Sequence, residues 1–246
     1  MTRQNRPTTA FVLAAGLGQR MRPLTDTLPK PLVPLAGRAL IDHVLDRLAE
    51  AGITNAVVNA HYRADQIETH VRTRTSPHVE ISDERGALLE TGGGVVRALP
   101  MLGDAPFVIH NSDSVWIDDN NKNLERLLTT WDAGRMDSLM LLAPTATSLG
   151  YDGKGDFNIT PVGRLTRRGS GTTAPYVFAG VSIIHPCMFN GEAERPFSLN
   201  RVWDRAIAAG RLYGIVLDGL WMHVGTPEAL EGANAVIART AKGRRA

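Results

Sequence analysis

The stretch AFVLAAGLG, residues 10–18, decides how the rest of the chain is interpreted. Its first part, AFVLAA, is an unbroken apolar run, and Gly16 ends it. A short apolar run without alternation is typical of a strand buried on both faces, as in a parallel sheet. We therefore expect a central strand at residues 10–15 that leads directly into a glycine-containing loop.

Beyond this strand, apolar strands and amphipathic helices alternate along the chain. Apolar residues recur at helical spacing over residues 40–48, and Gly52 supplies a stop. The further expected elements are strand 55–59, helix 64–71, strand 79–82, a glycine-rich turn at 90–94 with a helix to residue 99, strand 107–109, helix 124–131 and strand 138–143. This alternation predicts an α/β fold with a right-handed, doubly wound, mostly parallel, Rossmann-like sheet.

The pattern changes after Gly150, where glycine, threonine and short strands dominate. We expect strands at 156–160 and 176–184, a helix at 199–209, and a strand at 212–217. Thr226 and the Pro-Glu pair after it form a strong helix start, because Thr caps and Pro fits the first turn. This helix should run to about residue 239. The pattern in the second part of the chain therefore predicts a small β-rich lobe.

Polar or glycine residues follow three of the expected strands. Gly16, Asn59 and Asp113 each come directly after, or at the end of, an apolar strand. In doubly wound sheets, ligands bind outside the carboxyl ends of the strands. We therefore expect these three residues to lie near one ligand site.

The loop over residues 16–34 has the composition of a phosphate-binding segment. Gly16 and Gly18 leave room for backbone N–H groups to face an anion, and Arg20 and Lys30 add positive charge. A triphosphate that releases pyrophosphate needs such charge. A P-loop is excluded because Gly18 precedes Gln-Arg, and a dinucleotide fingerprint is excluded because position 21 is Met.

Composition and charge narrow the function classes. The formal net charge of the 246 residues is +2, which predicts no nucleic-acid partner, and the basic residues at the two ends (Arg3, Arg6, Lys242, Arg244 and Arg245) are interpreted as solvated tails. The single cysteine, Cys187, allows no intrachain disulfide. The longest apolar run near the start is too short for a signal peptide or a membrane span. We therefore expect a cytoplasmic protein without a membrane partner.

Six motifs together resemble one family, the sugar-1-phosphate nucleotidyltransferases. They are AGLGQRMRPLT (15–25), LPKPLVPLAG (28–37), LLETGGG (88–94), ALPMLGDAPF (98–107), GKGDF (153–157) and VGTPEAL (224–230). The resemblance extends from Phe11 to about Ile237. Within the family, LETGGG with GKGDF is most similar to the N-acetylmuramate-1-phosphate uridylyltransferases of peptidoglycan recycling, and next to mannose-1-phosphate guanylyltransferase-like proteins.

The resemblance implies roles for individual residues. The nucleotide-binding set it implies is Ala14, Ala15, Gly16, Gly18, Asn59, Glu90, Thr91, Gly92 and Gly93. Arg20, Lys30 and Asp113 would be catalytic, and Lys154, Asp156 and Gly180 would contact the sugar phosphate. Glycines in the 90–94 segment would suit the close approach of a flat base.

The resemblance also implies a divalent metal, Mg²⁺ or alternatively Mn²⁺. Asp113 matches the family's metal-binding aspartate, and a carboxylate there can hold Mg²⁺ against phosphates. The family's second metal aspartate falls at His223 in this chain. Imidazole is a poor ligand for hard Mg²⁺, so this departure puts the second metal position in doubt.

The resulting hypothesis is an enzyme that joins a nucleoside triphosphate to a sugar 1-phosphate and releases pyrophosphate. UTP with N-acetylmuramate 1-phosphate is favoured; GTP with mannose 1-phosphate and a regulatory module without catalysis are the alternatives. We expect one domain over residues 1–246, with a nucleotide-binding part at about 10–145, a sugar-phosphate-binding part at about 146–240 and a basic tail at 241–246. A monomer or small homo-oligomer is expected.

Overall fold

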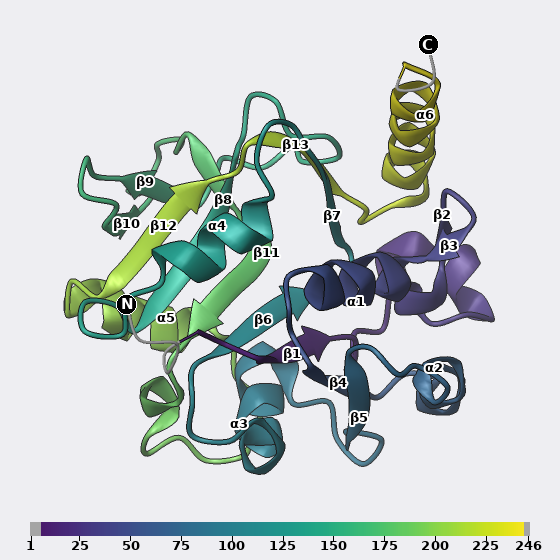
Figure 1. Ribbon diagram of the computed structural model, residues 1–246, viewed down its shortest axis with the longest axis horizontal. Helices are drawn as coiled ribbons and strands as arrows, with labels where there is room; N and C mark the ends of the chain where they lie inside the picture. Colours follow the sequence, from purple (N-terminus) through teal and green to yellow (C-terminus); the bar gives the residue numbers. More distant parts are fainter. Residues whose placement is uncertain (1–5, 244–246) are drawn as a thin grey trace.

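The apolar run near the N-terminus forms the central strand of the sheet. In the computed structural model, which describes residues 6–243, β1 (Thr9–Leu13) lies between β4 (Asn55–Ala60) and β6 (Phe107–Asn111) and is parallel to both (Figure 1). Phe11 and Val12 are completely buried. The strand is therefore covered on both faces, as its sequence predicts.

The remaining elements follow in a largely alternating order. The other strands are β2 (Pro34–Leu35), β3 (Arg38–Ala39), β5 (His78–Asp83), β7 (Ser114–Asp118), β8 (Ser138–Pro144), β9 (Phe157–Ile159), β10 (Leu165–Arg167), β11 (Tyr176–Ile184), β12 (Leu212–Val216) and β13 (Gly219–His223). The α-helices are α1 (Leu40–Glu50), α2 (Ala64–Val71), α3 (Glu90–Leu102), α4 (Asn123–Thr130), α5 (Asn200–Ala208) and α6 (Pro227–Gly243). Short 3-10 helices are η2 (Gln19–Met21), η3 (Leu24–Asp26), η4 (Lys30–Leu32) and η5 (Pro186–Phe189).

One nine-stranded sheet runs through both parts of the chain. The strands β5, β4, β1 and β6 are neighbours in that order and are parallel. β11 pairs antiparallel with β6 on one side and with β8 on the other, and β12 is parallel to β8. The expected α/β fold with a mostly parallel sheet is confirmed, with β11 as the antiparallel strand that joins its two halves.

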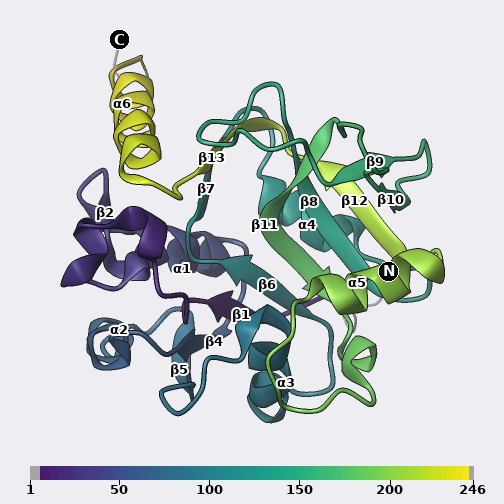
Figure 2. The ribbon, with the colours of Figure 1, turned by 180° about the vertical axis from the view of Figure 1, so that it is seen from behind.

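Helices cover both faces of this sheet (Figure 2). Apolar side chains of α1, α2 and α4 pack in one core cluster with Val12, whereas those of α3 and α5 pack in a second cluster with Phe11. Phe11 and Val12 belong to different clusters because successive side chains of a strand point to opposite faces. The doubly wound arrangement follows from this alternation.

One expectation about local structure is wrong, and one pair of strands was not expected. The segment at 90–94 is not a turn before a helix, because α3 begins at Glu90 and contains all three glycines. In addition, β7 and β13 were not expected from the sequence; they pair antiparallel as a separate two-stranded sheet. The pairing places His223 opposite Ser114, and it therefore brings the C-terminal part of the chain to the end of β6.

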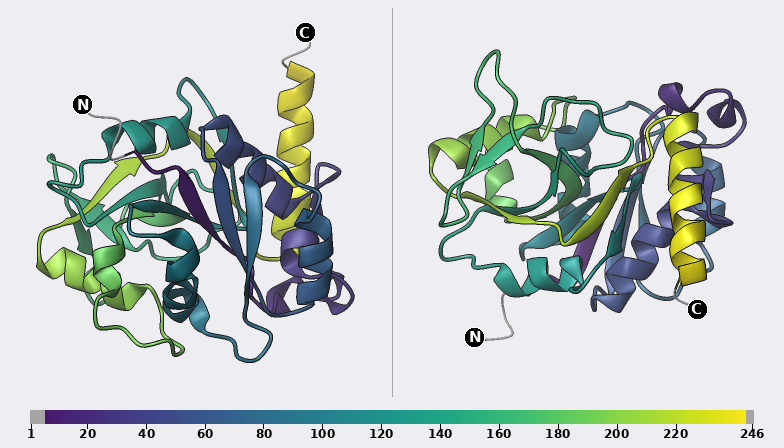
Figure 3. Two further views of the ribbon diagram at one scale, coloured as in Figure 1. Left: turned by 60° about the horizontal axis from the view of Figure 1, so that its bottom comes forward. Right: turned by 90° about the horizontal axis from the view of Figure 1, so that it is seen from above.

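A third core cluster fixes the loop that follows β1. Met21, Val33 and Leu35 from the loop and hairpin are buried with Val224 and Leu230, the latter from α6. α6 packs beside the β2–β3 hairpin at one end of the sheet (Figure 3). Buried apolar contacts between the N-terminal loop and the C-terminal part of the chain therefore hold the loop in place.

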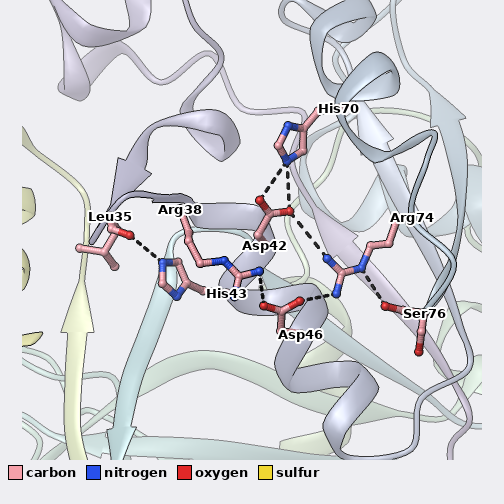
Figure 4. Close-up of polar contacts among 8 residues, drawn as sticks. All are labelled: Leu35, Arg38, Asp42, His43, Asp46, His70, Arg74 and Ser76. Atoms are coloured by element: carbon pink, nitrogen blue, oxygen red, sulfur yellow. Dashed lines mark hydrogen bonds and ion pairs between the residues drawn. The ribbon is translucent and has the colours of Figure 1, made fainter. Parts of the chain in front are cut away.

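Polar contacts fasten the hairpin and α2 to α1 (Figure 4). Asp46 of α1 pairs with Arg38 of β3 at 2.5 Å and with Arg74 at 2.5 Å, and Asp42 accepts from His70 of α2 at 3.0 Å. Exposed ion pairs are individually weak, but several on one helix act together. This network, with the bond between the His43 ring and the Leu35 carbonyl, anchors the segment that follows the loop.

The chain ends lie partly beyond the described residues. Arg3, Arg244 and Arg245 are outside them, and so is the side chain of Lys242. Arg6 is not simply solvated, because its guanidinium donates to the Ala51 carbonyl and to Glu125. No helix within residues 6–243 has both the length and the apolar character to cross a bilayer.

A buried histidine lies in the central strand β6. The His110 ring stacks on Trp116, with ring centroids 5.5 Å apart, and its Nδ1 lies 2.8 Å from the Asn111 carbonyl oxygen. Its Nε2 has no hydrogen-bond partner among the described residues. Burial lowers the pKa of His110 to about 3, so the ring is neutral at pH 7.

We expect His110 to contribute to acid unfolding. An unfolded chain takes up this proton near pH 6.5, whereas the folded chain does so only near pH 3. The unfolded state therefore binds more protons between these values, and the free energy of unfolding should fall as pH falls through them. In His110→Leu, urea denaturation should give a shallower fall over this interval. Parallel curves for the two proteins would exclude this role.

Candidate active site

A cavity of about 720 Å³ opens at the carboxyl ends of β1, β4 and β6. Its wall includes ten of the residues that the sequence singled out: Ala14, Ala15, Gly16, Gly18, Arg20, Lys30, Asn59, Glu90, Thr91 and Asp113. The wall also includes Leu88, Ser112 and Ser198, which were not predicted. Parallel neighbouring strands bring these distant residues together, because their carboxyl ends meet at one edge of the sheet.

The glycines of the loop have two different surroundings. A Cβ atom on Gly16 would meet no other atom within 4 Å, so Gly16 borders open space in the cavity. Gly18 has a φ of +65°, and a Cβ there would lie 3.0 Å from Thr25 Cγ2 and 3.2 Å from Lys30 Cβ. Gly18 is therefore required by the turn itself, which a Thr25 hydroxyl bond to the Gly18 carbonyl closes at 2.9 Å.

Asn59 holds the first turn of the loop. Its Oδ1 accepts from the backbone N–H of Ala14 at 2.7 Å and of Ala15 at 3.3 Å. Asn59 is almost completely buried, so these amides would otherwise have little access to water. The side chain therefore fixes the backbone that lines the cavity.

Opposite charges meet in the cavity wall. Lys30 Nζ lies 2.5 Å from Asp113 Oδ2, and the two side chains are only 13% and 19% exposed. Burial alone would raise the pKa of Asp113, but the charge and the hydrogen bond of the Lys30 ammonium bring it below its ordinary value. Asp113 is therefore ionised at neutral pH. Arg20 lies in the same wall, so this charged end of the cavity has two cations beside Asp113, and Glu90 is a second acidic residue of the wall.

His223 lies close to this charged pair, at the end of β13. The backbone N–H of Val224 donates to the Asp113 carbonyl at 3.3 Å, and the imidazole stacks on Trp221. Burial lowers the pKa of His223, with Lys30 and Arg20 acting in the same direction and Asp113 opposing them. The ring therefore keeps a free lone pair at neutral pH. A Cβ on the cavity residue Gly225 would lie 2.7 Å from His223 Nε2.

Comparisons with known proteins show the family to which this chain belongs. Residues 9–151 match the Nucleotidyl transferase family. The chain is 46% identical over 236 residues to N-acetylmuramate alpha-1-phosphate uridylyltransferase of Caulobacter vibrioides, covering 94% of this chain and 98% of that protein. The chain belongs to the nucleotidyl transferase family.

Two further comparisons give lower sequence identities. A mannose-1-phosphate guanyltransferase of Aspergillus oryzae is 30% identical over 225 residues. The aligned region covers 89% of this chain and 61% of that protein. The crystal structure of apo-UDP-glucose pyrophosphorylase superposes on this chain with a TM-score of 0.76 and 14% sequence identity. The superposition covers 96% of this chain and 99% of that one. At that identity the likeness shows the fold alone.

Two of the glycines predicted to approach a base have close protein neighbours. Gly92 and Gly93 are not among the residues of the cavity wall. A Cβ on Gly92 would lie 2.3 Å from the Phe197 ring, and one on Gly93 would lie 2.1 Å from the Arg195 carbonyl oxygen. The need for glycine here therefore comes from the contact between α3 and the 195–197 segment.

The residues predicted to contact the sugar phosphate also lie outside the cavity wall. Asp156 accepts from the Phe178 backbone N–H at 3.1 Å, so it is tied to the start of β11. Gly180 has a φ of +81°, and a Cβ there would lie 2.6 Å from Ser114 Cβ, beside Asp113. Lys154 is exposed. The three residues belong to the β9–β11 region rather than to the cavity wall, most of which comes from the first half of the chain.

We expect Gly93→Ala to destabilise the protein. The added methyl group meets a backbone carbonyl that cannot move aside as a flexible side chain would, so about 1–3 kcal/mol of unfolding free energy should be lost. Gly86→Ala is the matched control, because a Cβ there meets nothing within 4 Å. Denaturant unfolding of both variants decides the point. A stable Gly93→Ala protein with weakened nucleotide binding would instead support the original base-contact interpretation.

Proposed function

We propose that this chain transfers the uridylyl group of UTP to N-acetylmuramate α-1-phosphate and releases pyrophosphate. The observation that carries the reaction class is the convergence of Arg20, Lys30 and Asp113 on one cavity behind a glycine-containing loop. The choice of substrates is supported by 46% identity to the Caulobacter vibrioides uridylyltransferase over nearly its whole length.

The cavity suits a nucleoside triphosphate. Its volume of about 720 Å³ lies within the range of small-molecule sites, and it joins apolar groups to a charged end. We assign the nucleoside to the walls made by Ala14, Ala15, Asn59, Glu90 and Thr91. The phosphates would then lie along the loop from Gly16 to Arg20, toward Lys30 and Asp113, where positive charge is available.

The reaction is a direct displacement at phosphorus. An oxygen of the sugar phosphate attacks the α-phosphorus and forms a new O–P bond, while the bond from that phosphorus to the bridging oxygen breaks. Pyrophosphate leaves with the electron pair. The attacking group is already an anion at neutral pH, so no general base is needed. Catalysis is therefore positioning and charge neutralisation, which we assign to Arg20 and Lys30.

Lys30 is held ready for this role by Asp113. Their 2.5 Å contact keeps the ammonium in the cavity wall without substrate. When a triphosphate enters, Lys30 can donate to the α-phosphate at little reorganisation cost, because its long side chain is already directed there. Arg20 adds a second set of donors on the same side.

The donor set fits a divalent metal that arrives with the triphosphate. No group of three His, Cys, Asp or Glu side chains that could hold a metal occurs within residues 6–243. Mg²⁺, however, commonly uses one or two carboxylates together with substrate phosphates and water. We assign Asp113 as its protein ligand, with the nearby His223 as a second donor better suited to Mn²⁺. The ion would supply further neutralisation of the phosphate charge.

The sugar phosphate is assigned to the second part of the chain, at about 146–240. Gly180 leaves β11 close to Ser114 and Asn111, beside the charged end of the cavity. We propose Lys154, Asp156 and Gly180 as the contacts to the sugar phosphate, with the first part, at about 10–145, binding the nucleotide.

Removing either cation should lower turnover sharply. We expect Lys30→Ala and Arg20→Ala each to reduce the rate by roughly 10²–10³-fold, as for other preorganised charge contacts. Arg22→Ala is the matched control, because Arg22 lies in the same loop but is exposed and pairs with Asp26. Pyrophosphate release measures the rate, and thermal unfolding checks the fold. Near-normal rates in both test variants would remove the assigned role.

The substrates are tested by pairing each of four nucleoside triphosphates with several sugar 1-phosphates. We expect the fastest pyrophosphate release with UTP and N-acetylmuramate α-1-phosphate. Faster turnover of GTP with mannose 1-phosphate would replace the proposed substrates with those of the guanylyltransferases. Nucleotide binding without any turnover would indicate a regulatory module that has lost catalysis.

A further inference from the structure

A buried carboxylate lies directly behind the nucleotide cavity. Glu84 follows β5 and is completely buried. Its Oε1 accepts from Asn59 Nδ2 at 2.7 Å, and its Oε2 accepts from the Leu89 backbone N–H at 3.2 Å. No ion pair involves Glu84 within the described part of the chain. Glu84 does not belong to the cavity wall itself.

The surrounding sequence makes room for this carboxylate. A Cβ on Gly94 would lie 2.6 Å from Glu84 Oε1 and 3.0 Å from Asn59 Nδ2. Glycine inside a helix is destabilising, and burying an unpaired carboxylate is costly as well. Both features are explained if the contact between Glu84 and Asn59 serves a purpose other than stability.

Glu84 dictates which way the Asn59 amide faces. Both Glu84 oxygens accept hydrogen bonds, one from the Asn59 amide and one from the Leu89 N–H, so the amide turns its NH₂ group toward Glu84. The amide oxygen is then left for the N–H groups of Ala14 and Ala15, which it accepts at 2.7 Å and 3.3 Å. With the amide reversed, its NH₂ would face two backbone donors. Glu84 therefore fixes the backbone of the first turn through Asn59.

Glu84 also fixes the opposite wall of the cavity. Its second oxygen holds the Leu89 N–H, between the wall residues Leu88 and Glu90. Glu90 has a φ of +57°, a conformation that an ordinary side chain adopts only when its surroundings enforce it. One carboxylate thus connects the loop after β1 with the start of α3.

We propose that Glu84 is a positioning residue for nucleotide binding, which sets the separation and orientation of the two cavity walls. The inference rests on the proposed function only in taking the occupant of the cavity to be a nucleoside triphosphate. Glu84 acts through Asn59 and the Leu89 amide and touches no reacting atom. Its loss should therefore weaken nucleotide binding more than it slows the chemical step.

The test compares three single variants with the unaltered protein. We expect Glu84→Ala to raise the Kd and KM for UTP about tenfold or more, while kcat at saturating UTP changes less. Glu84→Gln should give an intermediate Kd, because its amide oxygen can still accept from Asn59 but its NH₂ would face the Leu89 N–H. Asp83→Asn, at an exposed neighbour that contacts Arg85, should leave the Kd unchanged.

Gly94→Ala disturbs the same contact from the other side. Its methyl group should displace the Glu84 carboxylate and raise the Kd for UTP in the protein that keeps Glu84. The same substitution in a Glu84→Ala background should raise the Kd less, because the atom it strikes is gone. Independent, multiplicative effects of the two substitutions would contradict a shared route through Glu84.

Calorimetric titration with UTP separates the possible failures. If Glu84→Ala unfolds, Glu84→Gln decides, since it keeps the size of the side chain. A UTP Kd within twofold of the unaltered value in both folded variants would overturn the inference alone. Absence of nucleotide binding by the unaltered protein would overturn the proposed function together with this inference.

Discussion

Lys30 and Asp113 carry opposite charges on two segments that are 83 residues apart, and their 2.5 Å contact closes the charged end of the cavity. The contact exists only because β1 and β6 are parallel neighbours, so that the loop after one strand meets the end of the other. With little solvent exposure, the pair is screened less than a surface ion pair. The positions of Arg20 and His223, which lie around the pair, depend on this same junction.

Two sets of contacts hold the Lys30–Asp113 pair and the cavity wall in position. At the end of the cavity proposed to hold the phosphates, buried apolar residues such as Met21 and Val33 hold the loop against the β7–β13 ribbon and α6. At the end proposed to hold the nucleoside, the Glu84–Asn59 contact fixes the backbone of Ala14 and Ala15. The first set of contacts is apolar and tolerates substitutions that conserve side-chain volume, whereas the second set depends on directed hydrogen bonds. A small loop can therefore present both an open wall and a preorganised charge.

Much of this arrangement could be predicted from the sequence, because it follows from strong local patterns. The apolar run before Gly16 and the strand that ends near Asp113 identify the sheet and the edge where the site lies. Glycine counts against a helix, so the sequence of the GGG segment predicts a turn; the close contacts of Gly92 with Phe197, of Gly93 with Arg195 and of Gly94 with Glu84 appear only in the structure. Glu84 sits in the polar sequence DERG, which resembles an exposed turn, and nothing local indicates its burial.

The proposed mechanism requires Lys30 and Asp113 to face the reacting phosphate. A crystal structure of the protein with a non-hydrolysable UTP analogue and Mg²⁺ tests this requirement directly. We expect Lys30 Nζ to leave Asp113 and to lie within hydrogen-bonding distance of an α-phosphate oxygen, with the ion bound to Asp113. A triphosphate bound elsewhere, with the Lys30–Asp113 pair intact, would contradict it.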